Sequence, residues 1–273
     1  MQQYETILYE PGTVARVILN RPAVLNAQNL LMLRELNDAL HRASYDSEVR
    51  VIVLSANGRA FSAGHDVKEM NTPEWEKGRN SQEVWRAFER TRVTYAENHL
   101  AWRNIPKPTI AMVHGLCIFG GWMVASTMDM VFASDDAMFL PNPYPADYWA
   151  ITWELGARKT KELLYEHRYV TAAEAMELGF VNRVYSRDEL ERETLAYAGR
   201  VAENDPIHLR DLKLMVNQTQ DGMGFTTSVL AAFNGYNGRT RAQSWGDPGK
   251  EGHKDAVPYS RLVQKAKPPY KKN

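Results

Sequence analysis

The spacing of apolar residues along this chain predicts both buried strands and amphipathic helices. Short, mainly apolar runs at residues 51–54, 109–113 and 130–133 predict strands. Segments with helical spacing, residues 81–104 and 120–128, lie between these runs. Strands that alternate with helices in this way favour βαβ units, so we expect an α/β fold with a largely parallel sheet.

The two ends of the chain depart from this alternation. Residues 4–20 predict a β-hairpin that turns at Pro11 and Gly12. After residue 185 the pattern is mostly helical. We therefore expect a core over residues 1–185 and a C-terminal helical region and tail over residues 186–273.

Helix boundaries are marked by capping residues. Asn29 can cap a helix whose apolar positions keep helical spacing, namely Leu30, Leu33, Leu36 and Leu40. Thr171 and Glu174 have the spacing of a capping box, and Gly179 is expected to end the helix that they begin.

Composition and charge restrict the class of protein. The chain has 273 residues, of which 44% are hydrophobic and 24% charged, as is usual for a globular protein. Because 33 basic residues balance 33 acidic ones, no overall charge points to a nucleic acid. The apolar runs are shorter than the ~20 residues that cross a membrane, the N-terminus lacks the features of a secretory signal, and Cys117 is the single cysteine. We expect a cytoplasmic protein that has no nucleic-acid partner and does not span a membrane.

Two glycine turns stand where a predicted strand gives way to a helix. Gly64 lies in the first turn, and Gly120 and Gly121 lie in the second. Such turns leave backbone N–H groups without a partner at the start of a helix. Either turn alone could simply change the chain direction. Two such donors that converge on one oxygen would stabilise negative charge on a carbonyl group.

The sequence resembles the crotonase superfamily, the enoyl-CoA hydratases and isomerases. The resemblance rests on residues 61–70 and 106–121 around the two turns, and continues through residues 19–27 and 171–182 in family order. It implies a crotonase (ClpP-like) spiral of ββα units with a C-terminal helical trimerisation region. It also implies an acyl-CoA substrate, a coenzyme A thioester, with no further cofactor, and a homotrimer or homohexamer.

The resemblance also implies roles for particular residues. The backbone N–H groups of His65 and Gly120 would form an oxyanion hole for the thioester. Residues in and around the two turns would bind the substrate, namely Ala63, Gly64, Asp66, Lys68, Gly121 and Met123. No spacing of histidine, cysteine or carboxylates suggests a metal site.

Both glutamates that the family's hydratases use to activate water are replaced. Met123 stands three residues after the oxyanion glycine, and Pro143 stands where the second glutamate is expected. Neither side chain can transfer a proton. Hydration or isomerisation is the default reaction, and decarboxylation or hydrolysis of a C–C or thioester bond is the alternative. A non-catalytic homologue that binds acyl-CoA is a hypothesis of another class.

Asp147 is the candidate replacement because it is the one carboxylate in the loop at residues 141–150. Related dienoyl-CoA isomerases and dehalogenases place a working aspartate on this loop, although a surface turn residue is an equally good interpretation. Tyr144 and Tyr148 flank it and could donate a hydrogen bond or simply pack. The His65 side chain is a further candidate, since related methylmalonyl-CoA decarboxylases carry a histidine there; alternatively it pairs with Asp66 or a backbone carbonyl.

Two remaining features allow two interpretations each. His99 shares a predicted helical face with Trp85, so it is expected in the core or in an acyl pocket. The lysine-rich residues 249–273 are interpreted as a solvated tail, or as a segment that reaches a phosphate of coenzyme A, even across a subunit boundary.

Overall fold

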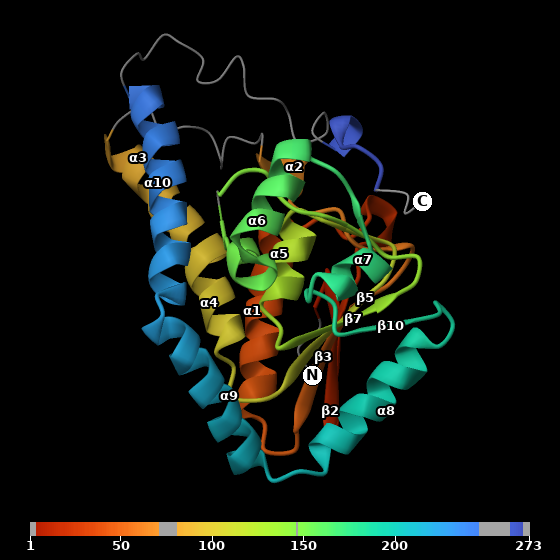
Figure 1. The fold of residues 1–273 in the computed structure, drawn as a ribbon. Coiled ribbons are helices and arrows are strands. Elements are labelled where there is room, and N and C mark those ends of the chain that lie inside the picture. Colours follow the sequence, from red (N-terminus) through yellow and green to blue (C-terminus); the bar gives the residue numbers. More distant parts are fainter. Residues whose placement is uncertain (1–3, 71–80, 146, 246–262, 270–273) are drawn as a thin grey trace.

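A six-stranded, largely parallel sheet carries most of the core (Figure 1). The computed structural model describes residues 4–70, 81–145, 147–245 and 263–269. The strand order is β1-β2-β3-β5-β7-β10. The strands are β1 (Ile7–Glu10), β2 (Val14–Leu19), β3 (Val51–Ala56), β5 (Thr109–Val113), β7 (Met130–Ser134) and β10 (Arg183–Tyr185). β1 and β2 form the predicted antiparallel hairpin, and all other neighbours are parallel, which confirms the α/β prediction.

A second sheet of short strands follows the order β4-β6-β8-β9. Its strands are β4 (Ala60–Ser62), β6 (Leu116–Ile118), β8 (Met138–Leu140) and β9 (Val170–Thr171). Each of β3, β5 and β7 is followed directly in the chain by one of the first three short strands. The chain thus repeats a unit of a long strand, a short strand and a helix. The pairs β4–β6 and β6–β8 are parallel, so the ends of these short strands lie along one edge.

Helices cover both faces of the six-stranded sheet. The α-helices of the described residues are α1 (Leu30–Tyr45), α2 (Val67–Met70), α3 (Ser81–Arg92), α4 (Asn98–Arg103), α5 (Gly120–Ser126), α6 (Ile151–Glu166), α7 (Ala172–Glu177), α8 (Leu190–Ala202), α9 (Pro206–Gly222) and α10 (Phe225–Trp245). Of these, α1 packs on one face of the sheet and α8 on the other. In Figure 1, α8 lies apart from α1, whereas α9 and α10 run beside α4 and α3. Asn29 and Thr171 cap α1 and α7 as predicted, and Gly179 adopts a positive φ just after α7.

Alternate residues of β3 explain its uninterrupted apolar sequence. Ile52 and Leu54 belong to the main core cluster with α1. Val51 and Val53 pack instead with Leu190 of α8 and its neighbours. All four β3 residues are fully buried, because a strand covered on both faces has no solvent side.

The predicted helix over residues 81–104 is wrong in one respect. A π-helical turn at Val93–Glu97 separates α3 from α4. A π-turn inserts extra residues per turn and rotates the preceding helix relative to the following one. As a result Trp85, expected beside His99, is 61% exposed, whereas His99 is buried.

Part of the predicted C-terminal tail docks on the second sheet. Lys267 forms a bridge with Arg168, and its carbonyl accepts a hydrogen bond of 2.9 Å from the Tyr169 N–H. Val263 and Ala266 pack against the cluster that contains Phe119 of the second glycine turn. Residues 263–269 of the predicted tail are thus docked, although Lys265 and Lys267 are exposed as the solvated-tail interpretation expects. Residues 249–262 and 270–273 lie outside the described part of the chain.

Candidate active site

The two glycine turns touch each other because they leave neighbouring strands. Gly64 follows β4, and Gly120 follows β6, its parallel neighbour. A Cβ atom added to Gly64 would lie 2.8 Å from the Ile118 carbonyl oxygen and 3.1 Å from the Gly120 nitrogen. Gly64 also has a φ of +85°, a conformation that residues with a Cβ rarely adopt. The contact between the turns is therefore one of backbone against backbone.

Gly120 and Gly121 are just as closely confined. A Cβ on Gly121 would lie 2.7 Å from the Ser62 carbonyl oxygen. A Cβ on Gly120 would lie 2.6 Å from Gln28 Oε1 and 3.0 Å from His65 Nε2. These side chains and carbonyls occupy the space that a larger residue would need.

The two amides assigned to the oxyanion hole are not used within the fold. The bridge between Gln28 and His65 uses the Gly64 carbonyl and the Asp66 N–H, in hydrogen bonds of 2.8 and 2.9 Å. In a parallel bridge the His65 N–H therefore faces away from Gln28. Gly120 opens α5, where an N–H has no helical acceptor. Neither N–H donates a hydrogen bond to any residue that the structure describes.

His65 and Asp147 form a buried pair next to these turns. His65 Nε2 lies 3.8 Å from Asp147 Oδ2, and the two side chains are 3% and 8% exposed. Burial lowers the pKa of His65 to about 4 and raises the pKa of Asp147 to about 7. At neutral pH His65 is therefore uncharged, and Asp147 can both release and accept a proton. The expectation that His65 pairs with Asp66 is wrong, since Asp66 forms an ion pair of 3.0 Å with Arg21.

Aromatic side chains enclose this pair. Tyr95 meets the His65 ring edge-on with centroids 4.7 Å apart. His99 stacks on Tyr148 at 5.8 Å, and burial together with the nearby His65 lowers the pKa of His99 to about 3. Tyr148 is 2% exposed and burial raises its pKa. The structure thus places His99 in an aromatic wall behind His65.

The other predicted site residues are dispersed around the turns. Tyr144 packs against Tyr236, with centroids 5.7 Å apart. Met123 is buried in an apolar cluster with Leu100 and Tyr148. Lys68 is exposed on α2. Ala63 and Pro143 are half-buried, and the structure shows no partner that assigns either of them a role.

Sequence reasoning missed two buried residues that support the first turn. The Asn26 side chain donates hydrogen bonds of 2.9 Å to the carbonyls of Asn57 and Ala60, so it holds the start of β4. Gln28 lies 1% exposed beside Gly120. Asn26 stood within the stretch on which the family resemblance rests, and this contact explains why it is there. Gln28 gave no signal, because a polar residue before a helix cap is ordinarily solvated.

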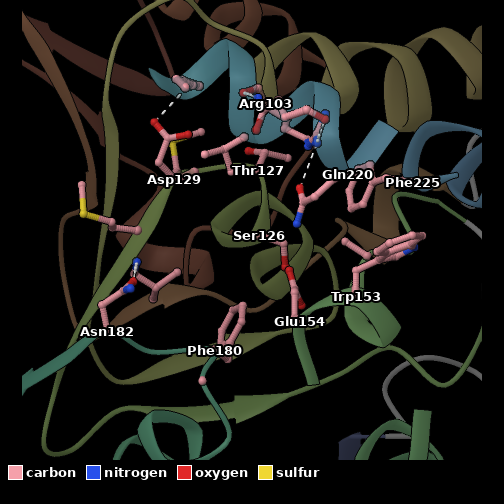
Figure 2. Close-up of a pocket in the computed structure, with 18 of the residues that line it drawn as sticks. Arg103, Ser126, Thr127, Asp129, Trp153, Glu154, Phe180, Asn182, Gln220 and Phe225 are labelled. Carbon is pink, nitrogen blue, oxygen red and sulfur yellow. Dashed lines mark hydrogen bonds and ion pairs between the residues drawn. The ribbon is translucent and has the colours of Figure 1, made fainter. Parts of the chain in front are cut away.

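A cavity of about 510 Å³ lies away from the turns, between the C-terminal end of α5 and helix α9 (Figure 2). Its charged groups are paired within the protein. Lys213 Nζ lies 2.9 Å from Asp129 Oδ2, and Arg103 donates a hydrogen bond of 2.9 Å to Gln220. Glu154 accepts a hydrogen bond of 3.0 Å from Trp122 Nε1, and burial raises its pKa to about 7. The cavity therefore offers no unpaired charge for a phosphate group among its described lining residues.

In the part of the chain that the structure describes, no helix is long and apolar enough to cross a membrane. No cluster of three or more histidine, cysteine or acidic side chains suited to a metal ion occurs there either.

The chain belongs to the enoyl-CoA hydratase/isomerase family, whose sequence profile matches residues 10–232. It is similar to the Mycobacterium tuberculosis protein named putative enoyl-CoA hydratase EchA13. The two are 37% identical over 257 residues, and the match covers 85% of this chain and 78% of EchA13.

Crystal structures of related proteins share the fold. One is described as a probable enoyl-CoA hydratase from Mycobacterium smegmatis, with 40% identity, 89% and 97% of the two chains covered and a TM-score of 0.79. Another is an enoyl-CoA hydratase/isomerase from Xanthobacter autotrophicus Py2, with 28% identity, 96% and 97% covered and a TM-score of 0.77. These similarities confirm the expected superfamily and its fold.

Replacing Gly64 by alanine tests the close contact between the turns. We expect Gly64→Ala to lower the free energy of unfolding by at least about 2 kcal/mol, because the positive φ and the 2.8 Å approach to the Ile118 carbonyl both oppose a Cβ. Gly199→Ala in α8 is the matched control, since a Cβ there meets nothing within 4 Å; it should be neutral or stabilising by up to about 1 kcal/mol. Urea unfolding of both variants measures the difference, and equal effects would contradict the contact.

The raised pKa of Asp147 predicts how stability depends on pH. Because the folded protein binds this proton more tightly than the unfolded chain, the contribution of Asp147 is most favourable below pH 4 and is lost as pH rises to about 7. Asn cannot ionise, so Asp147→Asn should gain stability relative to the natural protein over this interval, by up to about 4 kcal/mol. Denaturant unfolding at several pH values measures this gain. A constant difference between the two proteins would show that Asp147 titrates normally.

Proposed function

We propose that this protein is an enzyme that transforms an acyl-CoA thioester through an enolate-like intermediate. The N–H groups of His65 and Gly120 hold the thioester oxygen in an oxyanion hole. The observation that carries the proposal is the contact between two backbone turns whose amides have no acceptor in the described fold. Each such donor is worth ~3 kcal/mol to a developing oxyanion.

Asp147 is the acid and base of the proposed reaction. Its oxygen lies 3.8 Å from His65, the residue whose N–H serves the oxyanion hole. A carboxyl group with a pKa of about 7 matches the pH at which proton transfer is most efficient near neutrality. As a carboxylate it removes a proton from the α-carbon, the electron pair moves to the thioester oxygen, and the resulting acid returns the proton to carbon.

Met123 and Pro143 exclude the two-glutamate route to hydration. The Met123 side chain packs in an apolar cluster with Leu100 and Tyr148, where no water can be activated by a carboxylate at this position. Hydratase or isomerase chemistry remains the class that the family supports, with one carboxylate in place of two. No cofactor beyond the coenzyme A of the substrate is needed for these steps.

Decarboxylation of a malonyl-type CoA ester is the second candidate. It needs the oxyanion hole and a proton donor for the enolate, but no base to remove an α-proton. The uncharged His65 next to Asp147 favours it, because a buried site without fixed charge promotes loss of a substrate carboxylate as CO₂.

Turnover of matched substrates tests the proposal. We expect exchange of α-protons of a saturated acyl-CoA with deuterium oxide, measured by mass spectrometry, and a fall of 10²- to 10⁴-fold in kcat for Asp147→Asn with KM little changed. Asp188→Asn at an exposed site is the control and should be fully active. Crotonyl-CoA and malonyl-type esters assayed in parallel separate the two candidate reactions. If the protein binds acyl-CoA tightly but shows neither exchange nor turnover, the proposal of an enzyme fails and the protein is a non-catalytic acyl-CoA-binding homologue.

We also propose that the protein is a homotrimer, or a homohexamer built from trimers, in which α9 contacts a second copy. None of the α9 residues is buried in the single chain. Its exposed apolar side chains include Leu212, Leu214, Met215 and Val216. Helices with such a face are normally covered by a partner.

A charged residue on α9 tests this assembly. We expect Val216→Glu, at a position 58% exposed in the single chain, to reduce the mass measured by light scattering to that of a monomer. Lys161→Glu on α6 is the exposed control and should leave the mass unchanged. If the protein without substitutions is monomeric at micromolar concentration, the proposal is contradicted.

A further inference from the structure

Gln28 places an unpaired amide oxygen in the interior of the candidate active site. The residue is 1% exposed and lies between the 3-10 turn at Pro22–Val24 and helix α1. Its Oε1 atom is inaccessible to solvent and has no hydrogen-bond partner among the described residues. A buried acceptor without a donor is unfavourable, so its position calls for an explanation.

The hydrogen bonds of Ser62 determine which way the Gln28 amide points. The Ser62 hydroxyl donates its one hydrogen to the Asn26 carbonyl, 2.8 Å away, and accepts the Gly64 N–H at 3.1 Å. It can therefore only accept from Gln28, whose nearest amide atom lies 3.3 Å away. That atom must be the NH₂ group, and the oxygen must face the opposite side.

On that opposite side Oε1 and the ring of His65 border the same small space beside Gly120. Gln28 Oε1 and His65 Nε2 lie 2.6 and 3.0 Å from the same point, the position of a Cβ on Gly120. Asp147 Oδ2 lies 3.8 Å from the same nitrogen. One permanent acceptor, Gln28 Oε1, and a carboxyl oxygen that accepts when Asp147 is ionised thus lie in the buried surroundings of one ring nitrogen.

This arrangement favours one tautomer of neutral His65. With the proton on Nε2, the ring presents a donor toward both oxygens. With the proton on Nδ1, the Nε2 lone pair would face two oxygen lone pairs with no water to separate them. The other titratable side chains that contact or surround the ring are Tyr95 and His99.

We propose that Gln28 is a positioning residue that keeps the proton of His65 on Nε2 and so presents an N–H group to Asp147. The proposed interaction is a hydrogen bond from Nε2 to Oε1, formed by rotation of the side chains in the space that both atoms border beside Gly120. When Asp147 ionises, the same N–H can donate to its carboxylate. The inference deepens the proposed function, since it rests on Asp147 as the acid and base for its catalytic consequence.

The tautomer of His65 can be measured in the free protein. In ¹⁵N-histidine-labelled protein, the His65 signals are those lost in His65→Gln. We expect neutral His65 with its proton on Nε2 and Nδ1 as the unprotonated nitrogen. A proton on Nδ1, or rapid exchange between the two tautomers, would overturn the proposal. This measurement needs no activity, so it remains decisive even if thioester chemistry is not found.

Two variants and a control separate positioning from a structural role. Gln28→Leu removes the acceptor while keeping a similar side-chain volume. We expect this variant to populate both tautomers of His65 and to have a kcat about tenfold lower, with KM little changed. Gln28→Glu keeps an acceptor and adds charge, so it should retain the Nε2 proton and raise the pKa of His65. Glu203→Leu, at an exposed site between α8 and α9, should change neither property.

The outcomes distinguish this inference from the proposed function. Loss of thermal stability in Gln28→Leu with an unchanged tautomer and pH profile would mean a purely structural role and would refute it. If Gln28→Leu fails to fold, the natural protein and Gln28→Glu still give the tautomer and the pKa. If the tautomer is as expected but Asp147→Asn is fully active, the Gln28–His65 interaction stands and the role proposed for Asp147 fails.

Discussion

The contact between the backbone turns at Gly64 and Gly120 is the constraint on which the site depends. Parallel pairing of β4 and β6 brings the turns to one edge of the small sheet. Only glycine permits the final approach, since a Cβ on Gly64 would lie 2.8 Å from a carbonyl oxygen. The repeated long-strand and short-strand unit therefore does more than build a core: its second strand places each turn. Without that strand, the two amides would belong to separate loops with no fixed relation.

Burial sets the charge state of the groups beside the turns. The same loss of hydration lowers the pKa of His65 and raises that of Asp147, so at neutral pH His65 is uncharged and Asp147 is only partly ionised. A site of this kind differs from one built on two ionised glutamates. The negative charge of an enolate would be the principal charge in it, and backbone dipoles rather than ions would stabilise it. Met123, packed among Leu100 and Tyr148, is consistent with this low polarity.

Much of the fold could be predicted because its signals are local. The strand at residues 51–54 is uniformly apolar because both of its faces are covered, and Asn29 and Thr171 cap the helices that follow them. The small sheet could not be predicted from the apolar pattern since its strands are two or three residues long, too short for any period; only the family resemblance implied ββα units. Trp85 was misplaced because a π-turn leaves no clear mark in the sequence.

The candidate site was predictable only in part, for a different reason. The glycine turns could be recognised from their own residues, and the family resemblance joined them. The meeting of Gln28, His65 and Asp147 comes from three distant segments, and no spacing along the chain indicates it. Packing of the tail residues Val263 and Ala266 on the Phe119 cluster is equally non-local. Such contacts follow from the order of strands in the sheets, which sequence periodicity does not contain.

The central claim is that two main-chain amides polarise one thioester carbonyl. Difference infrared spectroscopy of a ¹³C=O-labelled, non-reactive acyl-CoA analogue tests it most directly, since hydrogen bonds to the oxygen weaken the carbonyl bond. On binding, the carbonyl stretch should shift to lower frequency and sharpen, as expected for an ordered site with two donors. A bound analogue whose carbonyl band stays where it is in water would contradict the account.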